Sequence, residues 1–165
     1  MTITKIHILA QHFNPDCKIT HSRICWLEIP ATSLPRASAF YASVLGWSSD
    51  PSQTIPASQI PGTSSLLIFS HPAVNGAFVE VSAPDVSVPK WREESESSEV
   101  GGGKVRHRSV MTSFSVESIE EVLDAVVKNG GRVDVPKTKI AAEGMGYFAH
   151  FVDTEGNLQG LWSNK

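Results

Sequence analysis

The sequence predicts an α+β fold in which one plan, a strand followed by a helix and then by further strands, occurs twice. The first observation is a β-prone strand, an N-cap serine, an apolar helix and a closing glycine, in this order, beginning at Ile24. The second is the same order beginning at Val110. The third is a C-terminal hairpin with a tight turn at Asp153–Gly156. Together they predict two paired β-α-β-β-β modules.

The first module is predicted to open with a strand over Ile24–Pro30, where apolar and polar residues alternate. Ser33 is then a suitable N-cap, and Pro35 suits the first turn of the helix that follows. Apolar residues recur at helical spacing as far as Gly46, which ends the helix; they are Leu34, Ala37, Phe40, Tyr41, Val44 and Leu45. Further strands are predicted at 65–70 and 77–82. The prolines between 47 and 61 favour a loop there.

The second module is predicted to repeat this order, with a strand over 110–116 and Ser118 as the N-cap. Glu121, three residues later, completes a capping box. One apolar stripe marks the helix; it consists of Ile119, Val122, Leu123, Val126 and Val127. Asn129, Gly130 and Gly131 then stop the helix. Three further strands are predicted, at 132–135, 147–152 and 158–162.

The domain organisation follows from these patterns. Residues 1–22 are expected to form an N-terminal extension, and 23–165 a single domain with modules at about 23–83 and 108–165. The stretch 84–107 is rich in Ser, Glu and Gly, so we interpret it as a mobile linker or a lid. Trp91 favours the lid, because a large aromatic side chain in a polar loop usually covers something.

The composition excludes several classes of partner. The chain has 165 residues, of which 41% are hydrophobic and 19% charged, and its formal charge is −3. Nucleic acid is not an expected partner, because there is no basic surplus to bind phosphates. No apolar run approaches the ~20 residues that span a bilayer, and no signal peptide is evident, so a cytoplasmic location is expected. Two cysteines make no disulfide framework, and the alternation of Cys25 with Leu27 and Ile29 predicts that Cys25 lies in the core.

Four segments resemble the vicinal oxygen chelate superfamily, which includes glyoxalase I, bleomycin-resistance proteins and extradiol dioxygenases. They are Trp26–Pro30, Phe40–Trp47, Gly130–Gly131 and Asp153–Asn157. The resemblance implies two curved mixed sheets around a pocket, with helices outside, and a homodimer. Two further segments, Asn75–Val79 and Gly160–Ser163, resemble a glyoxalase-related branch whose reaction is mostly unknown.

The resemblance also implies four metal-ligand positions, one on the first and one on the last strand of each module. They fall on Trp26, Met111, Gly160 and approximately Glu80. Tryptophan offers only an N–H donor, glycine has no side chain, and a thioether suits Zn²⁺, Ni²⁺, Mg²⁺ or Fe²⁺ poorly. One carboxylate does not hold a catalytic ion. We therefore expect no metal cofactor, and neither glyoxalase I chemistry nor extradiol cleavage, because both require a metal.

A site at displaced positions is the alternative. Glu28, Glu80 and His150 are candidate catalytic residues, and they would make a His-plus-carboxylate metal site if their strands brought them together. The ordinary interpretation is a pocket histidine with a routine hydrogen bond, and carboxylates paired with Arg106 or Arg108.

The remaining pocket is expected to bind a planar or apolar organic molecule. Its predicted lining combines aromatic, thioether, hydroxyl and glycine positions: Trp26, Met111, Ser113, Phe148, Gly160 and Trp162. Two interpretations follow. One is a metal-free binding protein in which Trp26 and Trp162 stack on the ligand. The other is a metal-independent isomerase, epimerase or lyase with His150 or a carboxylate as acid or base. The opposing possibility is that the aromatic side chains simply fill the pocket.

Overall fold

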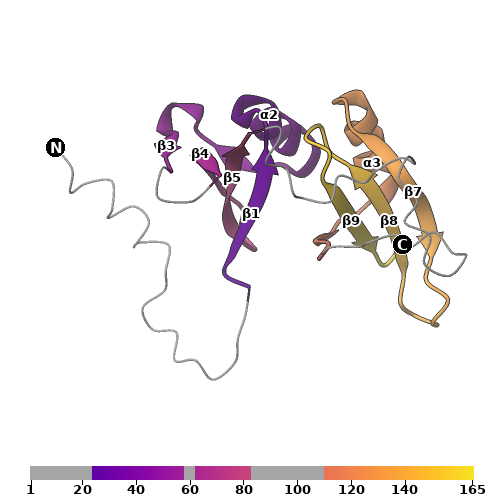
Figure 1. The fold of residues 1–165 in the computed structure, drawn as a ribbon. Helices are drawn as coiled ribbons and strands as arrows, with labels where there is room; N and C mark the ends of the chain where they lie inside the picture. Colours follow the sequence, from indigo (N-terminus) through magenta and orange to yellow (C-terminus); the bar gives the residue numbers. More distant parts are fainter. Residues whose placement is uncertain (1–23, 58–61, 83–109) are drawn as a thin grey trace, which may run out of the picture.

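The computed structural model describes residues 24–57, 62–82 and 110–165, and within them the α+β class is confirmed (Figure 1). The first module contains β1 (Trp26–Ala31), α2 (Leu34–Leu45), β2 (Ser48–Ser49), a 3₁₀ turn (Pro51–Gln53), β3 (Ile55–Pro56), β4 (Thr63–Ser70) and β5 (Asn75–Val81). The second contains β6 (Ser113–Ser115), α3 (Ile119–Lys128), β7 (Arg132–Lys139), β8 (Tyr147–Val152) and β9 (Leu158–Ser163). The predicted N-terminal extension and the whole of the predicted linker, Trp91 included, lie outside the described residues.

Each module forms one mixed sheet, and the two sheets have the same topology. Sheet A has the order β1-β5-β4-β2, with β3 also paired to β4, and sheet B has the order β6-β9-β8-β7. In each sheet the first strand runs parallel to the last one, while the other pairs are antiparallel. The registers match as well, because Glu28 pairs with Ala77 and Ser113 pairs with Gly160. Glu28 and Ser113 each lie five positions before the N-cap serine of their module. The predicted duplication is therefore confirmed in the pairing of the strands.

The helices begin and end as predicted from their caps. Gly46 ends α2 with a left-handed backbone, φ 69°, which costs glycine little. The Ser118 side chain accepts a hydrogen bond from the Glu121 backbone N–H at 3.3 Å, which satisfies one unpaired donor of α3. Ser33 occupies the N-cap position of α2 without a side-chain hydrogen bond. No helix of the described segments is long and apolar enough to cross a membrane.

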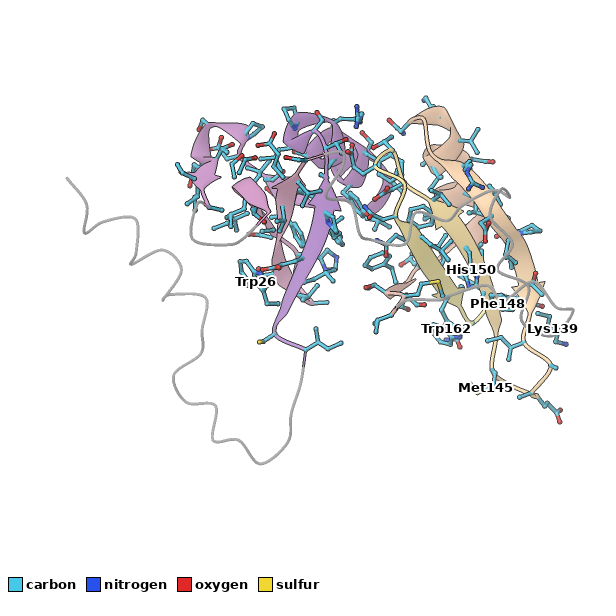
Figure 2. The ribbon with its side chains drawn as sticks, in the orientation of Figure 1. Trp26, Lys139, Met145, Phe148, His150 and Trp162 are labelled. Atoms are coloured by element: carbon cyan, nitrogen blue, oxygen red, sulfur yellow. The ribbon has the colours of Figure 1, made fainter. Side chains whose placement is uncertain are left out.

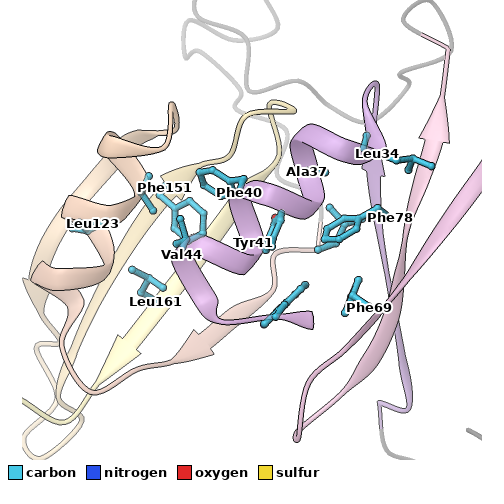
Figure 3. Close-up of a cluster of buried hydrophobic side chains, with 14 of the residues drawn as sticks. Leu34, Ala37, Phe40, Tyr41, Val44, Phe69, Phe78, Leu123, Phe151 and Leu161 are labelled. Carbon is cyan, nitrogen blue, oxygen red and sulfur yellow. The ribbon is translucent and has the colours of Figure 1, made fainter. Parts of the chain in front are cut away.

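One hydrophobic core joins both modules, because α2 lies between the two sheets (Figure 3). Tyr41 contacts Phe78 of sheet A at a ring separation of 5.3 Å, and Phe40 contacts Phe151 of sheet B at 6.2 Å. Trp47, which follows α2, stacks on Phe69 at 4.3 Å. Burying each such side chain contributes roughly 1.5–3 kcal/mol. The modules thus share one core over the described residues.

Three local expectations were wrong, each for a physical reason. The proline-containing stretch after Trp47 includes the short strands β2 and β3; Pro56 is tolerated there because β3 pairs with one neighbour only. The strand predicted over 110–116 pairs only at Ser113–Ser115. Cys25 is exposed and not a core residue, because β1 begins one position later.

Candidate functional site

The two faces of each sheet differ in what covers them. One face packs against the helices and carries the core side chains, such as Phe78 in sheet A and Leu161 in sheet B. Successive side chains of a strand point to opposite faces, so the neighbours of these core residues point away from the helices. We call this second face the distal face. It is the face that the family resemblance assigns to a pocket.

The distal face of sheet B brings together five predicted pocket residues and Ser115, in two rows. The first row runs from Ser113 on β6 through Gly160 on β9 to His150 on β8. The second row runs from Ser115 through Trp162 to Phe148 on the same three strands. The Phe148 and His150 rings are 5.3 Å apart, and Figure 2 shows both side chains close to Trp162. Met111 joins them from the segment before β6, as its contact with Gly160 shows.

Gly160 is the centre of this face. A Cβ at this position would collide with Ser113 Oγ and would lie 3.1 Å from Ser113 Cβ and 3.4 Å from Met111 Cε. The side chains of Ser113 and Met111 therefore lean across β9 and bury Gly160, whereas Ser113 itself stays exposed. A larger side chain at 160 would displace them. The absence of a side chain at 160 is thus part of how this face packs.

Trp162 is held in one orientation by a contact that the sequence analysis did not identify. Its indole Nε1–H donates a hydrogen bond to the Met145 carbonyl oxygen at 2.8 Å. Met145 lies in the loop between β7 and β8, between Gly144 and Gly146, which have φ values of 76° and 74°. The two glycines were visible in the sequence as turn signals, but nothing in the pattern indicated which side chain the turn would contact.

Sheet A presents a different and mostly aliphatic distal face. Its register forms one row from Glu28 through Ala77 to Ile68, and a second row from Pro30 through Val79 to Leu66. Trp26 belongs to this sheet, and Figure 2 shows it apart from the cluster of Phe148, His150 and Trp162. The structure therefore does not bring Trp26 against Trp162. The polar and aromatic groups gather on sheet B.

Glu80 lies on the helix face and does not join Glu28, contrary to the convergence considered above. It pairs in register with Ala31, which is a core residue, whereas Glu28 pairs with Ala77. The Glu80 carboxylate accepts hydrogen bonds from the side chains of Ser65 and Ser64, the latter at 2.7 Å. These bonds, that of Ser65 first, lower the pKa of Glu80. Glu80 is thus an ionised carboxylate satisfied by its neighbours on β4.

The residues at the family's ligand positions do not fit a divalent metal. The matched registers make Ala77, and not Glu80, the counterpart of Gly160. The four positions are then Trp26, Ala77, Met111 and Gly160, and none of them carries an imidazole or a carboxylate. Within the segments that the structure describes, no group of three or more His, Cys, Asp or Glu side chains is placed to hold an ion.

The turn that marks the family has a structural role. The Asp153 carboxylate accepts hydrogen bonds from the backbone N–H groups of Glu155 and Asn157, at 2.9 and 2.8 Å. The Asn157 side chain donates to the Pro30 carbonyl oxygen of β1 at 2.9 Å. Glu155 in turn binds Arg36 of α2 at 2.6 Å. The turn therefore fastens the last hairpin to the first module.

The fold is a duplicated β-α-β-β-β arrangement whose second module gathers polar and aromatic side chains on its distal face. The model of the Glyoxalase/Bleomycin resistance protein/Dioxygenase superfamily matches residues 23–159. The chain belongs to that superfamily.

Curated relatives of this chain are named as glyoxylases or glyoxylase-like proteins. A glyoxylase-like domain-containing protein of Didymella fabae is 30% identical over 145 residues, which cover 87% of this chain and 94% of the relative. A putative glyoxylase, CFP32, of Mycobacterium bovis is 26% identical over 143 residues; the chain spans 44% of that relative's length.

Solved structures agree in fold. A glyoxylase/bleomycin resistance protein/dioxygenase domain from Frankia sp. EAN1pec has a TM-score of 0.59 at 16% identity and covers 88% of this chain and 100% of that one. A variant of the fosfomycin resistance protein FosX from Listeria monocytogenes, solved with Mn(II) and 1S,2S-dihydroxypropylphosphonic acid, has a TM-score of 0.58 at 12% identity and covers 86% and 90%. At these identities the similarity concerns the fold.

Proposed function

We propose that this protein binds a planar, largely apolar organic molecule on the distal face of sheet B, without the divalent metal of its enzymatic relatives. The observation that carries this proposal is the fixed Trp162 ring in one row with Phe148, next to the side-chain-free position Gly160. Both rings are half-buried, so each keeps surface that a ligand can cover.

The fixed orientation of Trp162 favours binding. A ring whose N–H is already bonded to Met145 loses little conformational freedom when a ligand stacks on it. Aromatic pairs contribute about 0.5–1.5 kcal/mol beyond the burial of their surface. Two rings in adjacent strands therefore contribute about 1–3 kcal/mol beyond the apolar surface that the ligand buries.

The donor set supports a role other than glyoxalase I or dioxygenase chemistry. Those reactions need a metal as Lewis acid or as activator of oxygen, and the four family positions carry an indole, a methyl group, a thioether and no side chain. The proposed binding role therefore depends only on side chains that are present, and it requires no metal-binding residue that the chain lacks.

The second candidate is a metal-independent isomerase, epimerase or lyase. It is favoured by His150, which lies in the Gly160 row and beside the Phe148 ring, where it would reach a bound molecule as general acid or base. Glu28 lies on the distal face of sheet A and Glu80 faces the helices, so neither carboxylate belongs to the row of His150. Homodimer formation and a cytoplasmic location stay predictions of the sequence.

Binding of quinoline, a planar bicycle without oxygen, tests the proposal by calorimetric titration. We expect Trp162→Ala and Phe148→Ala each to weaken quinoline binding about 3- to 10-fold, as the loss of one aromatic contact implies. The matched control is Tyr147→Ala, which removes a half-buried ring from the same strand on the opposite face. Equal affinities in all four proteins, or no binding to the wild type, would contradict the proposal. If the wild type converts a bound molecule and His150→Gln still binds that molecule but no longer converts it, the second candidate, a metal-independent enzyme, is favoured.

A further inference from the structure

We propose that the Ser113 hydroxyl and the His150 imidazole form an oxygen subsite above Gly160, which makes the ligand a planar aromatic molecule with a carboxylate. This inference rests on the proposed function, because the ring of the ligand is taken to lie on Trp162 and Phe148. In this subsite two hydrogen-bonding side chains would bind the oxygen atoms of the ligand. In this chain the residues at the family's metal positions do not suit a metal that could do so.

The register of the strands places the two groups on either side of one residue. Ser113 and His150 both pair with Gly160, one from β6 and the other from β8. Neighbouring strands lie about 4.8 Å apart, so the two Cα atoms are separated by about 10 Å. Such a separation leaves room for one carboxylate with a hydrogen bond of about 2.8 Å on each side.

The serine hydroxyl leans into the middle of that gap. Its Oγ lies close enough to Gly160 to collide with a Cβ at that position, on the His150 side of its own strand. Ser113 is exposed, and within the described segments its side chain makes no hydrogen bond to another residue. The O–H donor is therefore free to turn toward a ligand oxygen. Met111, which also reaches across Gly160, supplies an apolar wall beside it.

The aromatic row lies at the right separation to hold the rest of the molecule. Trp162 follows Gly160 by two positions on β9, about 6.6–6.8 Å along the strand. That distance is on the order of the separation between a carboxylate and the far ring of a fused bicycle. A molecule with its carboxylate between Ser113 and His150 would therefore place its ring over Trp162 and Phe148.

The equivalent place in sheet A has different chemistry, which makes the assignment specific to one module. There the same row consists of Glu28, Ala77 and Ile68. A carboxylate on the protein repels an anionic ligand, and Ile68 offers no hydrogen bond. Of the two equivalent rows, the one in sheet B is therefore compatible with an anionic ligand, and the one in sheet A repels it.

The test compares the affinities of quinoline-6-carboxylate and quinoline in calorimetric titrations at pH 7.5. We expect the wild type to prefer the carboxylate about tenfold, because each of the two donors contributes about threefold, which is within the net range of an ordinary hydrogen bond. Ser113→Ala should reduce this preference to about threefold or less, because one of the two donors is lost. Gly160→Ala should do the same, because its Cβ would displace the hydroxyl.

The matched control is Ser115→Ala, an exposed serine on the same strand and face but in the next row. It should retain the full preference. The inference is overturned if the wild type shows no preference, or if Ser113→Ala and Ser115→Ala behave alike. Because quinoline binding and its dependence on Trp162 are measured separately, this outcome is distinguishable from failure of the binding proposal, in which neither probe binds. A cooperative unfolding transition of Gly160→Ala would show that this variant is folded. If Gly160→Ala does not fold, the comparison of Ser113→Ala with the wild type tests the subsite alone.

Discussion

The hydroxyl of Tyr41 donates a hydrogen bond of 2.8 Å to the Asp153 carboxylate, and both side chains are buried. Tyr41 belongs to α2 of the first module and Asp153 to the turn between β8 and β9 of the second. The Gln159 side chain donates to the same hydroxyl at 3.2 Å. Burial, and then the nearby Asp153 charge, raise the pKa of Tyr41, so it remains the donor. The two modules are thus joined by a polar contact within their common apolar core.

Removal of this hydroxyl should destabilise the protein. In Tyr41→Phe the Gln159 amide loses its acceptor, and Asp153 loses one donor but keeps its backbone donors. An unsatisfied buried group costs about 1–3 kcal/mol. We expect a loss of at least about 1 kcal/mol in the free energy of unfolding by urea. The control is Tyr147→Phe, whose hydroxyl makes no hydrogen bond within the described part of the chain. Equal stabilities of the two variants would contradict the structural role.

The pH dependence of stability should carry a signature of Asp153. Burial raises the pKa of Asp153 above its ordinary value near 3.8, although hydrogen bonds from Asn157 and Tyr41 act in the opposite direction. The folded state therefore binds the proton more tightly than the unfolded state does. The contribution of Asp153 is most favourable below the ordinary value and is lost as the pH rises through the raised value.

This signature is measured by comparing the wild type with Asp153→Asn, which does not titrate. The free energy of unfolding of the wild type minus that of the variant should fall as the pH increases from about 3.5, and should then level off. Urea unfolding at half-unit intervals of pH provides the values. A difference that rises with pH over this range would mean that the hydrogen bonds outweigh burial, and the assignment would be wrong.

More of the helices and strands than of the candidate site could be predicted from the sequence. Cap residues and apolar spacing give the start of α2 after Ser33, its end at Gly46 and the repeat in α3, because these signals are local. The alternation of Phe148 and His150 on β8 likewise indicates their common face. The residues of sheet B that share a face were therefore predictable strand by strand.

The position of Glu80 was not predictable in this way. Alternation tells which residues of one strand share a face, but not how that strand is aligned with the next one. The alignment of β5 depends on Phe78, which packs against Tyr41 in the core and turns Glu80 to the helix face with it. The contact of Trp162 with Met145 depends in the same way on the path of a loop.

The contribution of the Trp162 hydrogen bond to ligand affinity should be separable from the contribution of stacking between its ring and the ligand. Trp162→Phe keeps an aromatic ring but loses the N–H donor that binds the Met145 carbonyl oxygen. We expect its affinity for quinoline to lie between those of the wild type and Trp162→Ala, because the ring remains but is no longer fixed. Isothermal titration calorimetry gives the three values. An affinity equal to that of Trp162→Ala would show that the indole itself is required, and one equal to the wild type that the anchor is irrelevant.

The most direct test of metal-independent binding is one titration with quinoline-6-carboxylate, carried out before and after EDTA treatment and again with one equivalent each of Zn²⁺, Ni²⁺, Mn²⁺ or Mg²⁺. The chemistry of Trp26, Ala77, Met111 and Gly160 predicts the same dissociation constant in every case, since none of them donates to such an ion. Binding that disappears with EDTA and returns with one equivalent of a divalent ion would contradict the account.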